Sequence, residues 1–172
     1  MKDYINNCFN HILNRSVSKP YLYLLEQVLN RKISFNAWHR FKFIKMSDQE
    51  VIIKAPFIRA NKNHLGGIHA CAIATIGEYS AGLTLLKNFG ISKYRIIMKE
   101  LNVEYIKQAP GAVFATAMFT KKIKQEILET IAIESASSIE LQSNIYNSDE
   151  EKIAIVTTKW QIKDWRKVNF KA

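Results

Sequence analysis

The spacing of hydrophobic residues changes along the chain and predicts the order of its elements. In the first 35 residues, apolar side chains recur at helical spacing and predict two helices, the second opened by Ser18 and Pro20. Residues 38–46 and 50–57 are extended segments separated by a polar turn at 47–49. These two segments predict a β-hairpin.

Residues 70–86 predict a helix whose hydrophobic side chains lie on all sides rather than on one stripe. Such a helix must be enclosed by other structure. Gly77 and Gly82 each disfavour a helix by about 1 kcal/mol relative to Ala, so they indicate close backbone packing. A helix that breaks at these glycines is the alternative interpretation.

Four more extended segments follow, at 94–107, 112–122, 137–147 and 152–165, and a short amphipathic helix is predicted within 122–132. Several segments alternate like half-buried antiparallel strands, with Val113, Ala115 and Ala117 on one face. An antiparallel sheet wrapped around the helix is the economical way to bury it. We therefore predict a single α+β domain with N-terminal helices, and we find no internal repeat or linker.

Composition narrows the class of protein. The chain has 172 residues, 48% of them hydrophobic and 23% charged, as in ordinary globular proteins. We expect a soluble, cytoplasmic protein, because no signal peptide or membrane-spanning stretch stands out. Cys8 and Cys71 lack metal-ligand spacing, so neither a metal site nor a disulfide framework is expected.

The formal net charge of +10 implies an anionic partner. Nucleic acid, a phospholipid surface and a phosphorylated cofactor all carry such charge, and charge alone does not choose among them. The absence of an RNA-binding motif or a recognition-helix pattern argues against nucleic acid.

Glu78 is the only charged residue between His69 and Lys87. A carboxylate in such an apolar helix is costly to bury unless it is paired or protonated, and burial should raise its pKa. Two interpretations stay open. Glu78 is a functional acid, or it lies at a helix edge or subunit boundary where it is hydrated or paired.

The loop before the helix carries Asn63, Gly66, Gly67 and His69. Glycines permit unusual backbone conformations, and the free N–H groups of a first helical turn can bind an oxyanion, as acyl transfer requires. A structural, hydrogen-bonding role for His69 is the competing interpretation. We expect Cys71 to be a small buried residue rather than a nucleophile.

The spacing of His69 and Glu78 constrains any shared site. Nine positions separate them, which places them on opposite sides of a helix and roughly 13 Å apart along it. If both act on one substrate, the loop of one copy must face Glu78 of a second copy across a two-fold axis.

The pattern N-x-x-G-x-x-H-x-x-A, followed by E-x-x-x-G, resembles that of the PaaI-like hotdog thioesterases, and more closely that of their DUF4442 branch. The segment NVEYIKQAPG at 102–111 adds to the resemblance, which covers about residues 36–166. We accordingly divide the chain into an N-terminal helical extension, 1–35, and a hotdog domain, 36–172.

This resemblance implies a hotdog dimer, or a dimer of dimers, with an acyl-CoA or acyl-carrier thioester at the subunit interface. Glu78 would be the nucleophile or the general base, and Asn63 would position water or the thioester. His69 would open the helix, and the Ala70 N–H would polarise the carbonyl. No cofactor is implied beyond the CoA of the substrate.

The sequence departs from the commoner family pattern at two places. His69-Ala70-Cys71 replaces the usual HGG, and Met98 stands where some members carry a hydroxyl residue. Gly66, Gly67, Cys71 and Met98 would then line the substrate site. Candidates to bind the CoA phosphates are the basic residues Arg59, Lys62, Lys107, Lys121 and Lys122.

Two functions follow as hypotheses, a thioester hydrolase and a hotdog protein that binds an acyl or CoA ligand without turnover. A weaker third is nucleic-acid binding through the basic surface, which would be steeply salt-dependent.

Overall fold

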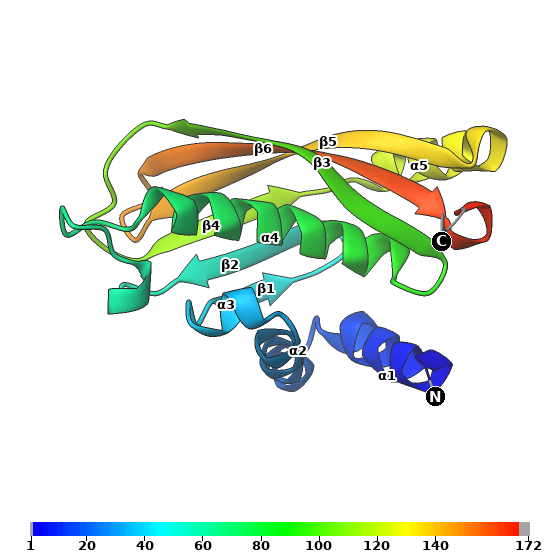
Figure 1. Ribbon diagram of the computed structural model, residues 1–172, viewed down its shortest axis with the longest axis horizontal. Helices are drawn as coiled ribbons and strands as arrows, with labels where there is room; N and C mark the ends of the chain where they lie inside the picture. Colours follow the sequence, from blue (N-terminus) through cyan, green and yellow to red (C-terminus); the bar gives the residue numbers. More distant parts are fainter. Residues whose placement is uncertain (1, 169–172) are drawn as a thin grey trace.

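A computed structural model describes residues 2–168 and shows a curved sheet with one long helix along its face (Figure 1). Two helices, α1 (Lys2–Arg15) and α2 (Lys19–Lys32), and a short α3 (Ser34–Ala37) come first. The remaining elements are β1 (Lys42–Met46), β2 (Glu50–Ala55), the 3-10 turn η1 (Arg59–Asn61), α4 (Ala70–Phe89), β3 (Tyr94–Tyr105), β4 (Val113–Met118), α5 (Lys121–Glu134), β5 (Ala136–Asn147), β6 (Lys152–Asp164) and η2 (Trp165–Lys167).

The six strands form one antiparallel sheet in the order β1-β2-β4-β5-β6-β3. The hairpin predicted from the first two extended segments is β1–β2. Because α4 packs against β2, β3, β4, β5 and β6, the sheet wraps around it as predicted. Strands β1 and β3 are the two edges of the sheet.

The core lies between α4 and the concave face of the sheet. Strand β6 shows how alternation builds it, because Val156, Trp160 and Ile162 are buried in turn against the helix. Helix α5 adds Ile127 and Ile131 to the cluster at the C-terminal end of α4.

Gly77 and Gly82 lie inside an unbroken α4, so the glycines mark close packing and not a break. A Cβ at Gly77 would lie 2.4 Å from Val156 Cγ2, and one at Gly82 would lie 3.0 Å from the Trp160 ring. Only glycine therefore lets α4 approach β6 so closely at Gly77.

The strand predicted at 38–46 is shorter than expected and begins at Lys42. Arg40 has a left-handed backbone, with φ of 51°, which ends any extended run there. Polar contacts hold this turn instead. Asn61 Nδ2 donates to the carbonyls of His39 and Pro56, at 3.0 and 2.9 Å, and the Asn61 side chain pairs with His39 Nδ1.

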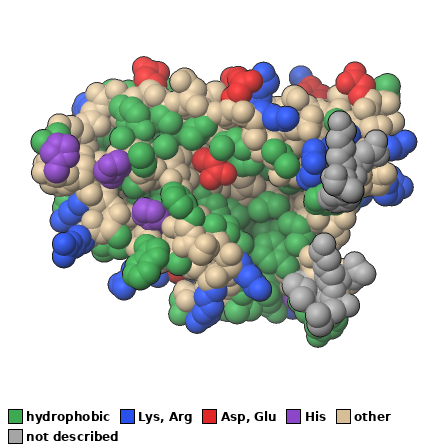
Figure 2. Space-filling view, viewed as in Figure 1, with side chains coloured by type: hydrophobic (Ala, Val, Ile, Leu, Met, Phe, Trp, Pro, Cys, Tyr) green, Lys and Arg blue, Asp and Glu red, His purple; other side chains and the backbone are tan. Residues whose placement is uncertain are grey.

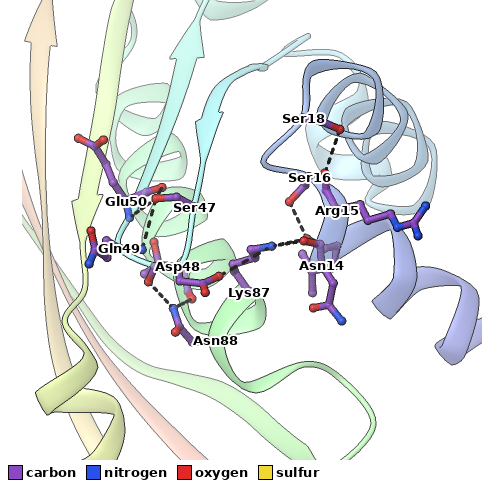
Figure 3. Close-up of polar contacts among 12 residues, drawn as sticks. Asn14, Arg15, Ser16, Ser18, Ser47, Asp48, Gln49, Glu50, Lys87 and Asn88 are labelled. Carbon is purple, nitrogen blue, oxygen red and sulfur yellow. Dashed lines mark hydrogen bonds and ion pairs between the residues drawn. The ribbon is translucent and has the colours of Figure 1, made fainter.

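Two buried charges attach the N-terminal helices to the domain. Glu26 on α2 accepts hydrogen bonds from Lys42 Nζ, at 2.8 Å, and from the Phe43 N–H, at 2.9 Å. Lys87 on α4 donates to the carbonyls of Leu13 and Asn14 at the end of α1, both at 2.8 Å (Figure 3). The C-terminal carbonyls of α1 are thus capped by a cation.

Candidate functional site

A groove of about 500 Å³ lies over the N-terminal half of α4, between α3 and the edge strand β3. Helix α4 presents Cys71, Thr75 and Glu78 to it, which share one face because they are four and three positions apart. Met98, Leu101 and Tyr105 of β3 form the opposite wall. Figure 2 shows an acidic side chain surrounded by hydrophobic ones on this face of the molecule.

Glu78 is half-buried in this groove. Among the side chains that the structure describes, its carboxylate has no ion-pair or hydrogen-bond partner, and its Oε1 lies 3.7 Å from where a Cβ would stand at Gly82. Desolvation by burial raises the pKa of Glu78 from its ordinary 4.5 to about 7. The acid is therefore poised to exchange protons near neutral pH.

The loop before α4 is held by Asn63. Its Oδ1 accepts from the N–H groups of Leu65 and Gly67, both at 3.0 Å, which fixes a tight turn. Gly66 completes this turn with φ of 83°, a conformation that favours glycine. Asn63 Nδ2 makes one long contact, 3.4 Å to the Ile68 carbonyl, and so retains capacity to donate.

The first turn of α4 leaves one N–H group free. His69 is the N-cap, and its Nδ1 accepts from the Cys71 N–H at 3.0 Å, which is the structural role considered for this histidine. The N–H groups of Ala72 and Ile73 bond to the His69 carbonyl. The exposed Ala70 N–H has no acceptor among the described residues. An oxyanion donor is therefore available at Ala70.

A second pocket, of about 330 Å³, contains this donor. It is lined by Asn63, Gly67 and Ala70 together with Tyr105 and Lys107, and Glu78 is not among its residues. The Tyr105 ring lines both hollows, and its Oη donates to the Ala70 carbonyl at 3.0 Å. In one copy of the chain, the loop thus lines the second pocket and the acid lines the adjacent but separate groove.

Only some of the other residues expected at the site line the groove or the Ala70 pocket. Met98 and Cys71 line the groove of Glu78, and Cys71 is exposed, so the prediction that it is buried is wrong. The reason is that Cys71 shares its helix face with Thr75 and Glu78, and this face lines the open groove rather than the core. Gly66 is exposed in the turn and lines neither hollow.

The basic candidates lie at two ends of the molecule (Figure 1). Lys107 lines the Ala70 pocket and pairs with Glu151 at 2.9 Å. Arg59 is exposed beside the loop, and Lys62 Nζ lies 3.8 Å from the centroid of the Phe57 ring. Lys121 and Lys122 begin α5, at the opposite end of the molecule from this loop (Figure 1).

Several groove residues were not predicted as site residues, and two of them are Asn36 and Tyr105. Asn36 of α3 is buried and lines the groove beside Tyr79, although it belongs to a segment that the sequence presented as a boundary. Tyr105 was visible only as part of the segment NVEYIKQAPG. No spacing rule in the sequence connects either residue with Glu78.

Strand β3 leaves a long edge open. It is 12 residues long, it pairs on one side only with β6, and Leu101 and Tyr105 are 43% and 49% exposed. Unprotected edge strands with apolar side chains favour pairing with another chain. The groove of Glu78 lies along this edge.

The His, Cys, Asp and Glu side chains that the structure describes form no group of three that could hold a metal ion. No helix in the same range is long and apolar enough to cross a membrane.

A family model described as "Domain of unknown function (DUF4442)" matches residues 23–162. No curated protein matches the sequence. The fold is similar to that of a Pseudomonas aeruginosa protein of unknown function described as a "Probable Thioesterase", with TM-score 0.76 and 20% identity over 83% of this chain and 95% of that one.

It is also similar to a Staphylococcus aureus thioesterase, with TM-score 0.62 and 22% identity over 76% and 98% of the two chains. A Haemophilus influenzae thioesterase gives TM-score 0.64 and 9% identity over 83% and 92%. At these identities the likeness establishes the fold, which is the hotdog fold. Solved variants of the S. aureus protein replace a glutamine and a glutamate that are fifteen positions apart.

Proposed function

The chain belongs to the DUF4442 family, and we propose that it hydrolyses acyl thioesters, of CoA or of an acyl carrier, at a site shared between two copies. The observation that carries this proposal is Glu78, an unpaired, half-buried carboxylate with a pKa near 7 in an apolar groove. Asn63 and Glu78 are fifteen positions apart, the separation of the two residues replaced in the S. aureus thioesterase.

The separation of the two hollows supports a shared site. The free Ala70 N–H and the Glu78 carboxylate belong to residues eight positions apart on α4, and these residues line different pockets. Antiparallel pairing of two β3 edges would bring the loop of one copy toward the Glu78 groove of the other. A two-fold axis then creates two equivalent sites per dimer.

The proposed reaction needs only groups of the protein and water. Ionised Glu78 takes a proton from a water molecule, and the resulting hydroxide attacks the thioester carbonyl carbon. The Ala70 N–H of the other copy stabilises the negative oxygen of the tetrahedral intermediate. When the carbon–sulfur bond breaks, the thiolate takes the proton from Glu78, and the carboxylic acid and free thiol are released. The alternative, direct attack by the Glu78 carboxylate, would pass through an anhydride.

Each remaining residue has a supporting role in this proposal. Asn63 fixes the turn through Oδ1 and offers Nδ2 to the thioester or to water. His69 caps α4 and so orients the Ala70 N–H. Cys71 and Met98 contact the acyl group, and Arg59 and Lys107 attract the phosphates of CoA.

A variant at Ala70 tests the oxyanion donor with little risk to the fold. Ala70 is the first residue of α4, where proline is tolerated, and His69 has φ −66° and ψ 138°, a conformation compatible with a following proline. Ala70→Pro therefore removes only a free N–H and should lower kcat about 100-fold to 1,000-fold. Ala70→Gly keeps the N–H and is the matched control, with activity near that of the wild type.

Glu78→Gln tests the acid in the same assay, release of free CoA from acyl-CoAs of increasing chain length. We expect loss of hydrolysis with retained folding. Wild-type protein that hydrolyses none of these substrates would refute the proposal.

One observation favours a second candidate, a protein that binds an acyl ligand without turnover. No side chain that the structure describes donates a hydrogen bond to Glu78 to orient it. This candidate predicts measurable acyl-CoA affinity in equilibrium dialysis and no release of thiol at any enzyme concentration.

A further inference from the structure

A separate apolar cavity of about 570 Å³ lies between α1, α2 and the C-terminal part of α4. Its walls include Phe9 and Ile12 of α1, Val28 and Leu29 of α2, and Leu86 of α4. Figure 2 shows a hollow floored by hydrophobic side chains on the face that carries α4. The size and lining match those of small-molecule sites, which span roughly 300–1,000 Å³.

Polar anchors hold α1 across this cavity without filling it. Lys87 binds the carbonyls at the end of α1, and Asn10 Nδ2 donates to Ser92 Oγ at 2.7 Å (Figure 3 for Lys87). Phe9 and Ile12 remain only partly buried, although they face the core. Apolar surface left uncovered in this way gains free energy when an apolar ligand fills the space.

One positively charged side chain at the edge of the cavity favours an apolar ligand that ends in an anionic group. Lys32, the last residue of α2, is the only charged residue among its described lining residues, and it is exposed to solvent. An ammonium group at the edge of an apolar cavity suits a chain that ends in an anion, because the stem stays in the cavity while the head group remains hydrated.

We propose that this cavity binds a single-chain fatty acid, with its alkyl chain among Phe9, Val28 and Leu86 and its carboxylate beside Lys32. The site is distinct from the groove of Glu78 and does not depend on catalysis. A fatty acid is also the product of a long-chain thioester, but binding here holds whether or not the protein hydrolyses one.

The two cysteines provide separate probes of the two hollows. Cys8 is exposed and lines the fatty-acid cavity, and Cys71 is exposed and lines the Glu78 groove. In Cys71→Ser protein, the rate of maleimide labelling reports on Cys8 alone. In Cys8→Ser protein, it reports on Cys71 alone.

The experiment measures both labelling rates with dodecanoate, dodecanol and dodecanoyl-CoA, each below its micelle concentration. We expect dodecanoate to slow labelling of Cys8 several-fold. Lys32→Glu should raise the half-protective concentration about fivefold, the scale of one exposed ion contact. Leu86→Trp fills the cavity and should abolish protection, and Lys32→Glu, an exposed substitution, keeps the test informative if Leu86→Trp does not fold.

Several outcomes would overturn the proposal. Labelling of Cys8 that dodecanoate leaves unchanged excludes a fatty acid in the cavity. Equal protection by dodecanol excludes recognition of the anion by Lys32. Dodecanoyl-CoA, measured in a Glu78→Gln background to prevent hydrolysis, should protect Cys71 and not Cys8, and equal protection of Cys8 would identify the thioester as the occupant. The proposed hydrolysis fails or succeeds separately, in the release of CoA.

Discussion

Glu78→Gln should make the protein more stable at alkaline pH, because burial disfavours the ionised carboxylate. The pKa of Glu78 is raised from 4.5 to about 7 by desolvation. Below pH 4.5 the acid is protonated in both the folded and the unfolded state, so its ionisation does not affect the free energy of unfolding. Between pH 4.5 and about 7, the carboxyl group ionises in the unfolded state but stays protonated in the folded state, so the free energy of unfolding falls as pH rises. Above pH 7 the loss is complete.

The magnitude follows from the difference between the two pKa values. At about 1.4 kcal/mol per pKa unit, ionisation of Glu78 reduces the stability by roughly 3 kcal/mol above pH 7. The neutral glutamine avoids this loss. The variant should therefore match the wild type near pH 4 and exceed it by roughly 2–3 kcal/mol at pH 8.5, once the remaining solvent access of the side chain is considered.

Urea unfolding at pH 4, 5.5, 7 and 8.5 gives this difference directly, with the protein concentration held constant because association would also stabilise the fold. Glu104→Gln is the control, since Glu104 is an exposed residue of β3 outside the groove and its substitution should change the free energy of unfolding by no more than about 0.5 kcal/mol. A flat profile for Glu78→Gln, or a variant less stable than the wild type at pH 8.5, would show that an unseen partner holds the carboxylate ionised and would refute the reasoning.

The packing and the chemistry give further predictions. Gly77→Ala should destabilise the protein by roughly 1–3 kcal/mol, since its Cβ would lie 2.4 Å from Val156 Cγ2, and Val156→Ala in the same chain should restore part of the loss in urea unfolding. Lys87→Met should speed hydrogen exchange in α1 selectively, because the capped carbonyls of Leu13 and Asn14 lose their donor; uniform acceleration across the domain would contradict this. If Glu78 is a general base, kcat/KM should rise with pH and level off above about 7, and a profile that falls over this range would exclude that role.

The fold could be predicted from the sequence because its signals are local and repeated. Helix α4 is apolar on all sides, which predicted that a sheet encloses it. The alternation of buried and less buried residues in strands such as β4 and β6 predicted that sheet. The error at residues 38–41 arose because Trp38 and Phe41 have high β propensity and precede the strand residues Phe43 and Ile44. The hydrogen bonds from Asn61, which is 22 positions away from His39, determine that turn instead.

The candidate site could be predicted only in part. Glu78 was identifiable because a lone charge in an apolar helix is conspicuous, and the first turn of α4 was identifiable from Gly66 and His69. Asn36 and Tyr105 were not, because tertiary packing alone brings α3 and β3 to α4. The exposure of Cys71 also depends on the direction that one helix face takes, which the pattern of an all-apolar helix does not specify.

Mixing two inactive variants tests the shared site most directly. Glu78→Gln keeps the loop donor, and Ala70→Pro keeps the acid. If each site combines the loop of one copy with the acid of the other, co-refolding equal amounts yields mixed dimers with one intact site each. The mixture should recover about a quarter of wild-type CoA release, because half of the dimers are mixed and one of their two sites is complete. A mixture as inactive as its separate components, beside an active wild type, would contradict a site divided between two copies.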